Sequence, residues 1–164
     1  AVDVGYGQLA WKLQSDPRVE VHDRTNVRTL DPASVAPAPD IVVGDMSFIS
    51  LTLVLPALVA AAAPDADFLL MVKPQFEIGK ERLGHGGVVR NPEHHVETVE
   101  NVARCAIGLG LDIAAIAPSP LPGPSGNVEY FLYMRRDYPE PINPQELTDY
   151  IRAAVAEGPA GGAL

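Results

Sequence analysis

The chain has 164 residues, of which 47% are hydrophobic, and this length and composition suit one folded domain with a buried core. Its formal net charge of −9 is unexpected for a domain that binds nucleic acid by itself, because phosphate contacts need clustered lysine and arginine. No apolar run is long enough to span a bilayer, and the start lacks a basic and then apolar leader. A single cysteine excludes an internal disulfide and a thiolate metal cluster. We expect a soluble, cytoplasmic protein with no metal site.

The first part of the chain is predicted to contain two strands. Residues 1–5 are typical of the end of a buried strand, and residues 19–23 of a second strand, with a short helix at residues 7–14 between them. Asp3 stands where nucleotide-binding α/β folds place an acid against the ribose hydroxyls of the ligand. An aspartate that only starts the following turn explains this residue equally well.

The centre of the chain predicts a strand–helix–strand unit. Residues 40–45 form an apolar run that ends in Asp45, and residues 67–73 form another that ends in Lys73. Residues 51–63 have the length and alanine–leucine content of a crossover helix, which makes the two strands parallel neighbours. Their carboxyl ends then meet at the edge where open α/β sheets bind ligands. The simpler alternatives are a helix cap for Asp45 and a solvated strand end for Lys73.

The second half begins with a long loop over residues 74–90, and loops of this length are commonly functional. Asn91 followed by proline predicts the start of a helix with one apolar face, which ends near Gly110. A weaker helix is expected at residues 143–156, followed by a frayed tail at residues 158–164.

Two further strands are expected at residues 111–117 and 128–134. The connection between them is too short for a crossover helix, so they should pair antiparallel or lie apart. Glu129 is the second residue of the later strand, and a carboxylate in an apolar strand is rarely buried unless it is paired. We favour a paired, functional Glu129 over an edge residue that faces water. His94 and His95 point to different faces of a helix start, so we expect a solvated first turn and no metal site.

Three segments carry a specific resemblance to a known family. They are Asp-Met-Ser-Phe-Ile-Ser at residues 45–50, Val-Lys-Pro-Gln-Phe-Glu at residues 72–77, and Pro-Leu-Pro-Gly-Pro-Ser-Gly-Asn-Val-Glu-Tyr-Phe at residues 120–131. With residues 3–12 and 24–26, these segments make the chain similar to the haemolysin A (TlyA) family. That family belongs to the FtsJ-like ribosomal-RNA 2′-O-methyltransferases, which use S-adenosylmethionine.

The resemblance implies a Rossmann-like class I methyltransferase fold, with a seven-stranded, mostly parallel sheet whose last strand is antiparallel. It implies a Lys-Asp-Lys-Glu catalytic tetrad, of which Asp45, Lys73 and Glu129 match the last three members and the first lysine has no counterpart. The cofactor-binding residues that it implies are Asp3, Val4, Thr25, Asn26 and Asp45.

The resemblance also bears on domain organisation. We expect residues 1–138 to form the methyltransferase domain and residues 139–164 a C-terminal helix and tail. Family members carry a basic S4-type RNA-binding domain upstream, followed by the first strand with its glycine-rich cofactor loop. The chain is therefore expected to lack the first central strand, between the strands that end at Asp3 and Asp45, and to bind ribosomal RNA or ribosomal subunits mainly through that upstream domain.

The function implied is methyl transfer from S-adenosylmethionine to a ribose 2′-hydroxyl of ribosomal RNA. Lys73 would either accept the hydroxyl proton or stabilise the developing alkoxide, and the sequence leaves both roles open. A small-molecule methyltransferase, a haemolysin-like protein and a non-catalytic interaction module are the alternatives. A membrane-lytic role lacks support, since the sequence shows no basic amphipathic helix.

Overall fold

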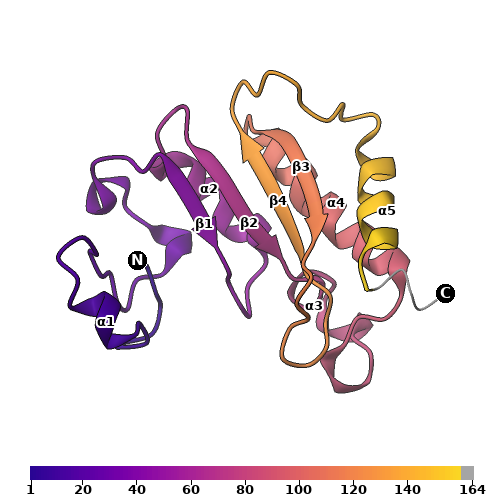
Figure 1. Cartoon of the computed structure of the whole chain (residues 1–164), viewed down its shortest axis with the longest axis horizontal. Helices are drawn as coiled ribbons and strands as arrows, with labels where there is room; N and C mark the ends of the chain where they lie inside the picture. The colour runs from indigo at the N-terminus through magenta and orange to yellow at the C-terminus, as the bar shows by residue number, and fades with distance from the viewer. Residues whose placement is uncertain (160–164) are drawn as a thin grey trace.

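The computed structural model describes residues 1–159, which form a mixed α/β fold around a four-stranded sheet (Figure 1). The strand order is β1-β2-β4-β3. The strands are β1 (Ile41–Gly44), β2 (Asp67–Val72), β3 (Asp112–Pro118) and β4 (Tyr130–Arg135). Because β1 pairs parallel with β2 while β4 is antiparallel to both β2 and β3, three strands run one way and β4 runs the other. The expected mostly parallel sheet with an antiparallel last strand is confirmed.

Two of the helices begin at a residue whose side chain caps them. Ser50 accepts a hydrogen bond from the Thr52 N–H at the start of α2, and Asn91 accepts one from the Glu93 N–H at the start of α4. The helices are α1 (Trp11–Gln14), α2 (Leu51–Ala61), α3 (Pro74–Glu77), α4 (Pro92–Gly108) and α5 (Leu147–Glu157). The predicted helix at residues 7–14 is thus reduced to one turn, and the predicted loop at residues 74–90 contains α3 and two short 3-10 turns.

One face of the sheet makes the core. Phe68, Leu70 and Leu132 are fully buried, and they belong to one apolar cluster with side chains of α2, α4 and α5. The alternation expected of a half-covered sheet places Leu69 on the other face, where it is 42% exposed. Among residues 1–159, no helix is both long enough and apolar enough to cross a membrane.

The two strands predicted at the start of the chain are not formed as buried strands. Residues 1–5 and 19–23 meet only in an isolated parallel bridge between Val2 and His22, supported by the Asp3 N–H bond to the His22 carbonyl at 3.0 Å. Val4 is 75% exposed because no other strand packs beside this bridge in the described part of the chain. The described residues therefore provide four strands and this bridge in place of the seven strands implied by the family resemblance.

The expected solvated first turn of α4 is wrong for His95, which is only 1% exposed. Its Nε2 lies 2.9 Å from the Val89 carbonyl oxygen, and its Nδ1 lies 3.1 Å from the Tyr130 hydroxyl. Because a carbonyl can only accept, Nε2 carries the proton and Tyr130 donates to Nδ1. Burial lowers the pKa of His95 and raises that of Tyr130, so both groups stay neutral at physiological pH.

The tail predicted at residues 158–164 lies mostly outside the described residues.

Candidate active site

The two parallel strands deliver their polar ends to one place. Asp45 follows β1 directly, and Lys73 follows β2. The Lys73 Nζ lies 2.5 Å from Oδ1 of Asp45 and donates a hydrogen bond to Oγ of Ser47 at 3.2 Å. The Lys73 side chain is only 11% exposed, whereas that of Asp45 is 69% exposed. The acid and the base therefore form a direct ion pair that is open to solvent on the Asp45 side.

Glu129 reaches the same place from the antiparallel strand. It immediately precedes β4, whose first residue Tyr130 pairs with Val72 at the end of β2. The Glu129 side chain is 7% exposed, and its Oε1 lies 3.9 Å from Nζ of Lys73. Glu129 is thus a buried carboxylate beside a cation, and not an edge residue that faces water. We call Asp45, Lys73 and Glu129 the strand-end cluster.

Gln75 contacts the strand-end cluster, although it was predicted only as part of the motif at residues 72–77 and not as a site residue. Its Nε2 donates to Oε1 of Glu129 at 3.0 Å, which gives the buried carboxylate a hydrogen-bond donor from the turn that follows Lys73. The Gln75 Oε1 is buried and has no partner among the described residues. The contact spans 54 residues of sequence, so only the pairing of β2 with β4 reveals it.

The loop before Glu129 is fastened to the long loop after β2. Asn127 is 3% exposed, accepts the Val89 N–H at 2.9 Å and donates to the Gly87 carbonyl at 3.0 Å. A Cβ atom at Gly123 would lie 2.9 Å from Oε1 of Glu129, so a larger residue there would displace the carboxylate. The Asn127 hydrogen bonds thus hold the loop that precedes Glu129, and Gly123 leaves room for its carboxylate.

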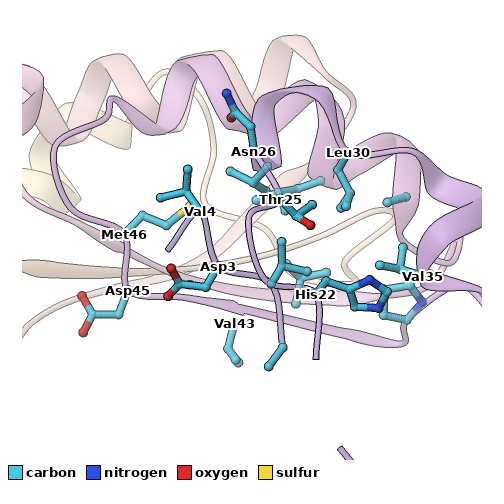
Figure 2. Close-up of a pocket in the computed structure, with 18 of the residues that line it drawn as sticks. Asp3, Val4, His22, Thr25, Asn26, Leu30, Val35, Val43, Asp45 and Met46 are labelled. Carbon is cyan, nitrogen blue, oxygen red and sulfur yellow. The ribbon is translucent and has the colours of Figure 1, made fainter. Parts of the chain in front are cut away.

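A groove of about 1290 Å³ lies between the N-terminal segment and β1 and reaches the strand-end cluster at Asp45 (Figure 2). Its lining includes all five residues predicted to bind the cofactor, which are Asp3, Val4, Thr25, Asn26 and Asp45. His22 and Met46 also line it and were not predicted as site residues, although Met46 lies in the motif at residues 45–50.

Asp3 also has the local role that was the alternative at the sequence level. Its Oδ1 accepts the Gly5 N–H at 2.6 Å and so shapes the turn. Its second carboxylate oxygen has no hydrogen bond within the described residues, and the side chain lines the groove. Turn formation and ligand binding are therefore compatible at this position.

An exposed aromatic residue stands next to the cluster. Phe48, one residue after Ser47, is 90% exposed and has a φ of 62°, which is unusual for a bulky side chain. Its ring lies 4.9 Å from that of Phe76 in α3. Such a backbone conformation costs on the order of 1–3 kcal/mol and is found most often at functional sites. Phe48 lies in the motif at residues 45–50, but nothing in the neighbouring sequence predicts its positive φ.

Residues 1–159 bring together no group of three His, Cys, Asp or Glu side chains that could hold a metal ion.

The sequence of this chain is similar to those of known methyltransferases. A family model described as FtsJ-like methyltransferase matches residues 1–136. The chain is 52% identical to the 16S/23S rRNA (cytidine-2'-O)-methyltransferase TlyA of Mycobacterium tuberculosis over 159 residues, which is 97% of this chain and 59% of that protein. It is 42% identical to YqxC of Bacillus subtilis, named as a candidate rRNA methyltransferase, over 82% of this chain and 48% of YqxC.

Solved structures show the same fold. A protein of Streptococcus thermophilus described as a candidate hemolysin superposes with a TM-score of 0.83 at 34% identity, covering 95% of this chain and 57% of that one. The chain therefore spans between about half and three fifths of the length of these relatives.

Proposed function

Because this chain belongs to the FtsJ-like methyltransferase family, we propose that it carries the site that transfers a methyl group from S-adenosylmethionine to a ribose 2′-hydroxyl of ribosomal RNA. The observation that supports this most strongly is the strand-end cluster, in which Lys73 lies between the carboxylates of Asp45 and Glu129 at the end of a groove. The named activity of the Mycobacterium tuberculosis relative supports ribosomal RNA, and cytidine within it, as the acceptor.

The groove residues suit the proposed cofactor chemically. Asp3 offers a carboxylate oxygen to ribose hydroxyls, and Thr25, Asn26 and Met46 line the same space. Asp45 adds a second carboxylate, which is paired with Lys73 but is 69% exposed and can also face the cationic groups of the ligand. When bound there, S-adenosylmethionine would supply an electrophilic methyl group.

Lys73 would act on the acceptor hydroxyl. Asp45 and Glu129 stabilise the positive charge of its ammonium group, and Ser47 accepts another of its N–H groups. As the hydroxyl oxygen forms its bond to the methyl carbon, the bond from that carbon to sulfur would break and leave a neutral thioether. The hydroxyl proton would pass to solvent, which reaches the cluster on the Asp45 side, while the Lys73 ammonium would stabilise the negative charge that develops on the oxygen. We propose this charge-stabilising role for Lys73, and that of a proton acceptor as the alternative to be tested.

Phe48 would receive the base of the target nucleotide. Unpaired bases in RNA are commonly stacked on aromatic side chains, and Phe48 is almost fully exposed beside the cluster with Phe76 behind it. A net charge of −9 makes this chain a weak phosphate binder, so we propose that other parts of the intact protein provide most of the affinity for ribosomal RNA or ribosomal subunits. The activity would then take place in the cytoplasm.

The test is methyl transfer by the intact protein. Ribosomal subunits from cells that lack the protein are incubated with radiolabelled S-adenosylmethionine and either the native protein or the variant Lys73→Ala. We expect label in ribosomal RNA with the native protein and a loss of about 10²-fold or more with the variant. Native protein that transfers no label to either subunit would contradict the proposed function.

A further inference from the structure

Glu77, at the end of α3, contacts the start of α2 although 26 residues separate them in sequence. Its Oε2 accepts a hydrogen bond from the Ser50 hydroxyl at 2.5 Å, and its Oε1 accepts the Leu51 N–H at 2.7 Å. Ser50 is also the residue whose side chain caps α2. One carboxylate therefore holds both the capping side chain and the first free backbone N–H of the helix.

The environment of Glu77 is unusual for a carboxylate with a purely local role. Burial raises the pKa of Glu77, while the bonds from Ser50 and Leu51 oppose that shift. No lysine or arginine forms an ion pair with it among residues 1–159, and its charge is met by the N-terminus of α2. The geometry of the contact, and which segments it joins, therefore decides whether its role goes beyond capping α2.

The contact joins the two segments that carry the reacting side chains. One segment runs from Asp45 through Ser47 to Ser50, and the other runs from Lys73 to Glu77. They are tied at one end by the Lys73 ammonium, which contacts Asp45 and Ser47. They are tied at the other end by the Glu77 carboxylate, which holds Ser50. The Phe48–Phe76 ring contact also joins the two segments, and the two hydrogen bonds of Glu77 add a directional restraint on their far ends that limits sliding and rotation of one against the other.

We infer that Glu77 is a positioning residue, which sets the place of the Lys73 ammonium relative to Asp45 by locking α3 to the start of α2. Its effect on catalysis rests on the proposed function, but its effect on the geometry of Lys73 does not. Displacement of a reacting group by about 1 Å can lower a rate by about 10²-fold, so a residue that never contacts substrate can still govern the rate.

A role confined to capping α2 makes a different prediction. In that case, loss of the Glu77 carboxylate lowers the stability of the fold but leaves the Lys73 ammonium where it is. The variants Glu77→Ala, Glu77→Gln and Glu81→Gln separate the two cases. Glutamine has the length of glutamate and keeps an acceptor oxygen for Leu51, whereas Glu81 is an exposed carboxylate in the next turn of the same loop and serves as the matched control.

The first readout is the NMR signal of the Lys73 ammonium in the intact protein, assigned by its loss in Lys73→Arg. The Lys73 side chain is only 11% exposed, so its ion-paired ammonium exchanges its protons more slowly than a solvated one, and its signal reports the contact with Asp45 whether or not RNA is methylated. We expect the signal to shift or disappear in Glu77→Ala and to persist in Glu77→Gln and Glu81→Gln. A signal that is unchanged in folded Glu77→Ala overturns the inference.

The second readout is the kinetics of methyl transfer. We expect Glu77→Ala to lower kcat by about 10–100-fold while KM for S-adenosylmethionine and for RNA changes by less than about threefold, with most of the rate restored in Glu77→Gln. If Glu77→Ala does not fold, Ser50→Ala replaces it, because it removes one of the two bonds and leaves the other. An unchanged NMR signal and kcat in Ser50→Ala then overturns the inference. Native protein that methylates no RNA refutes the proposed function, and the NMR result still decides the role of Glu77.

Discussion

The most informative substitution is at Lys73, because its ammonium lies between the two carboxylates of the strand-end cluster. Lys73→Ala removes a group that lies 2.5 Å from Asp45 and 3.9 Å from Glu129. Groups that handle the charge or proton of a reacting hydroxyl contribute about 10²–10⁴-fold to a rate. At about 1.4 kcal/mol for each factor of ten, this corresponds to an increase of about 3–6 kcal/mol in the activation free energy.

Lys73→Arg separates the two roles of the side chain. Arginine keeps the positive charge and nearly the same reach, but it cannot give up a proton in a protein. If the ammonium stabilises negative charge on the hydroxyl oxygen, the arginine variant retains a measurable part of the rate and the alanine variant does not. If Lys73 accepts the proton, both variants lose the rate equally.

The assay is single-turnover methyl transfer by the intact protein across a range of pH, with S-adenosylmethionine affinity measured in parallel by calorimetry. A charge-stabilising Lys73 predicts the same pH profile for the native protein and for the residual activity of the arginine variant. A rising limb that is present in the native protein and absent in the arginine variant would refute the charge-stabilising account. Cofactor affinity that stays within about threefold shows that the groove is intact.

Three further predictions test the groove, the exposed aromatic and the buried histidine. Asp3→Asn keeps the acceptor for the Gly5 N–H but removes the negative charge, so we expect the Kd of S-adenosylmethionine to rise by about 10-fold or more in calorimetry. The control Asp65→Asn changes an exposed carboxylate and should leave the Kd unchanged. A Kd for Asp3→Asn equal to that of the native protein would exclude Asp3 from the cofactor site. Phe48→Ala should raise KM for RNA by about 10-fold, Phe48→Tyr should restore it, and an unchanged KM would remove Phe48 from the acceptor site. Since burial lowers the pKa of His95, the unfolded chain binds its proton more readily, and the free energy of unfolding should fall as pH drops below about 6.5. His95→Gln should weaken this dependence in urea titrations, and an identical slope below that pH would show that His95 is not its source.

The sequence predicted the parts of the site that follow from local pattern and chain topology. The apolar runs before Asp45 and Lys73, with one helix between them, are sufficient to imply parallel neighbours, and these neighbours bring the two side chains to within 2.5 Å. The helix that starts after Asn91 was found from its cap and proline. Both predictions depend on residues that are close in the chain.

The features that could not be predicted depend on contacts between distant residues. The apolar pattern of residues 1–5 is that of a buried strand, but burial requires a neighbouring strand, and Val4 has none in the described part of the chain. His95 lies in the polar first turn of α4, and it is buried because Tyr130 of β4 packs against it. The role of Gln75 likewise depends on its hydrogen bond to Glu129, which precedes β4 and lies 54 residues away in the sequence.

The measurement that tests the central claim most directly is the chemical position of the transferred methyl group. Ribosomal RNA modified by the intact protein is digested to nucleosides and analysed by mass spectrometry, which distinguishes a methyl on the ribose from one on the base. The account predicts a nucleoside methylated on its 2′-oxygen that is missing when Lys73→Ala is used. A methyl group found on the base would contradict the assignment of the strand-end cluster to chemistry at a ribose hydroxyl.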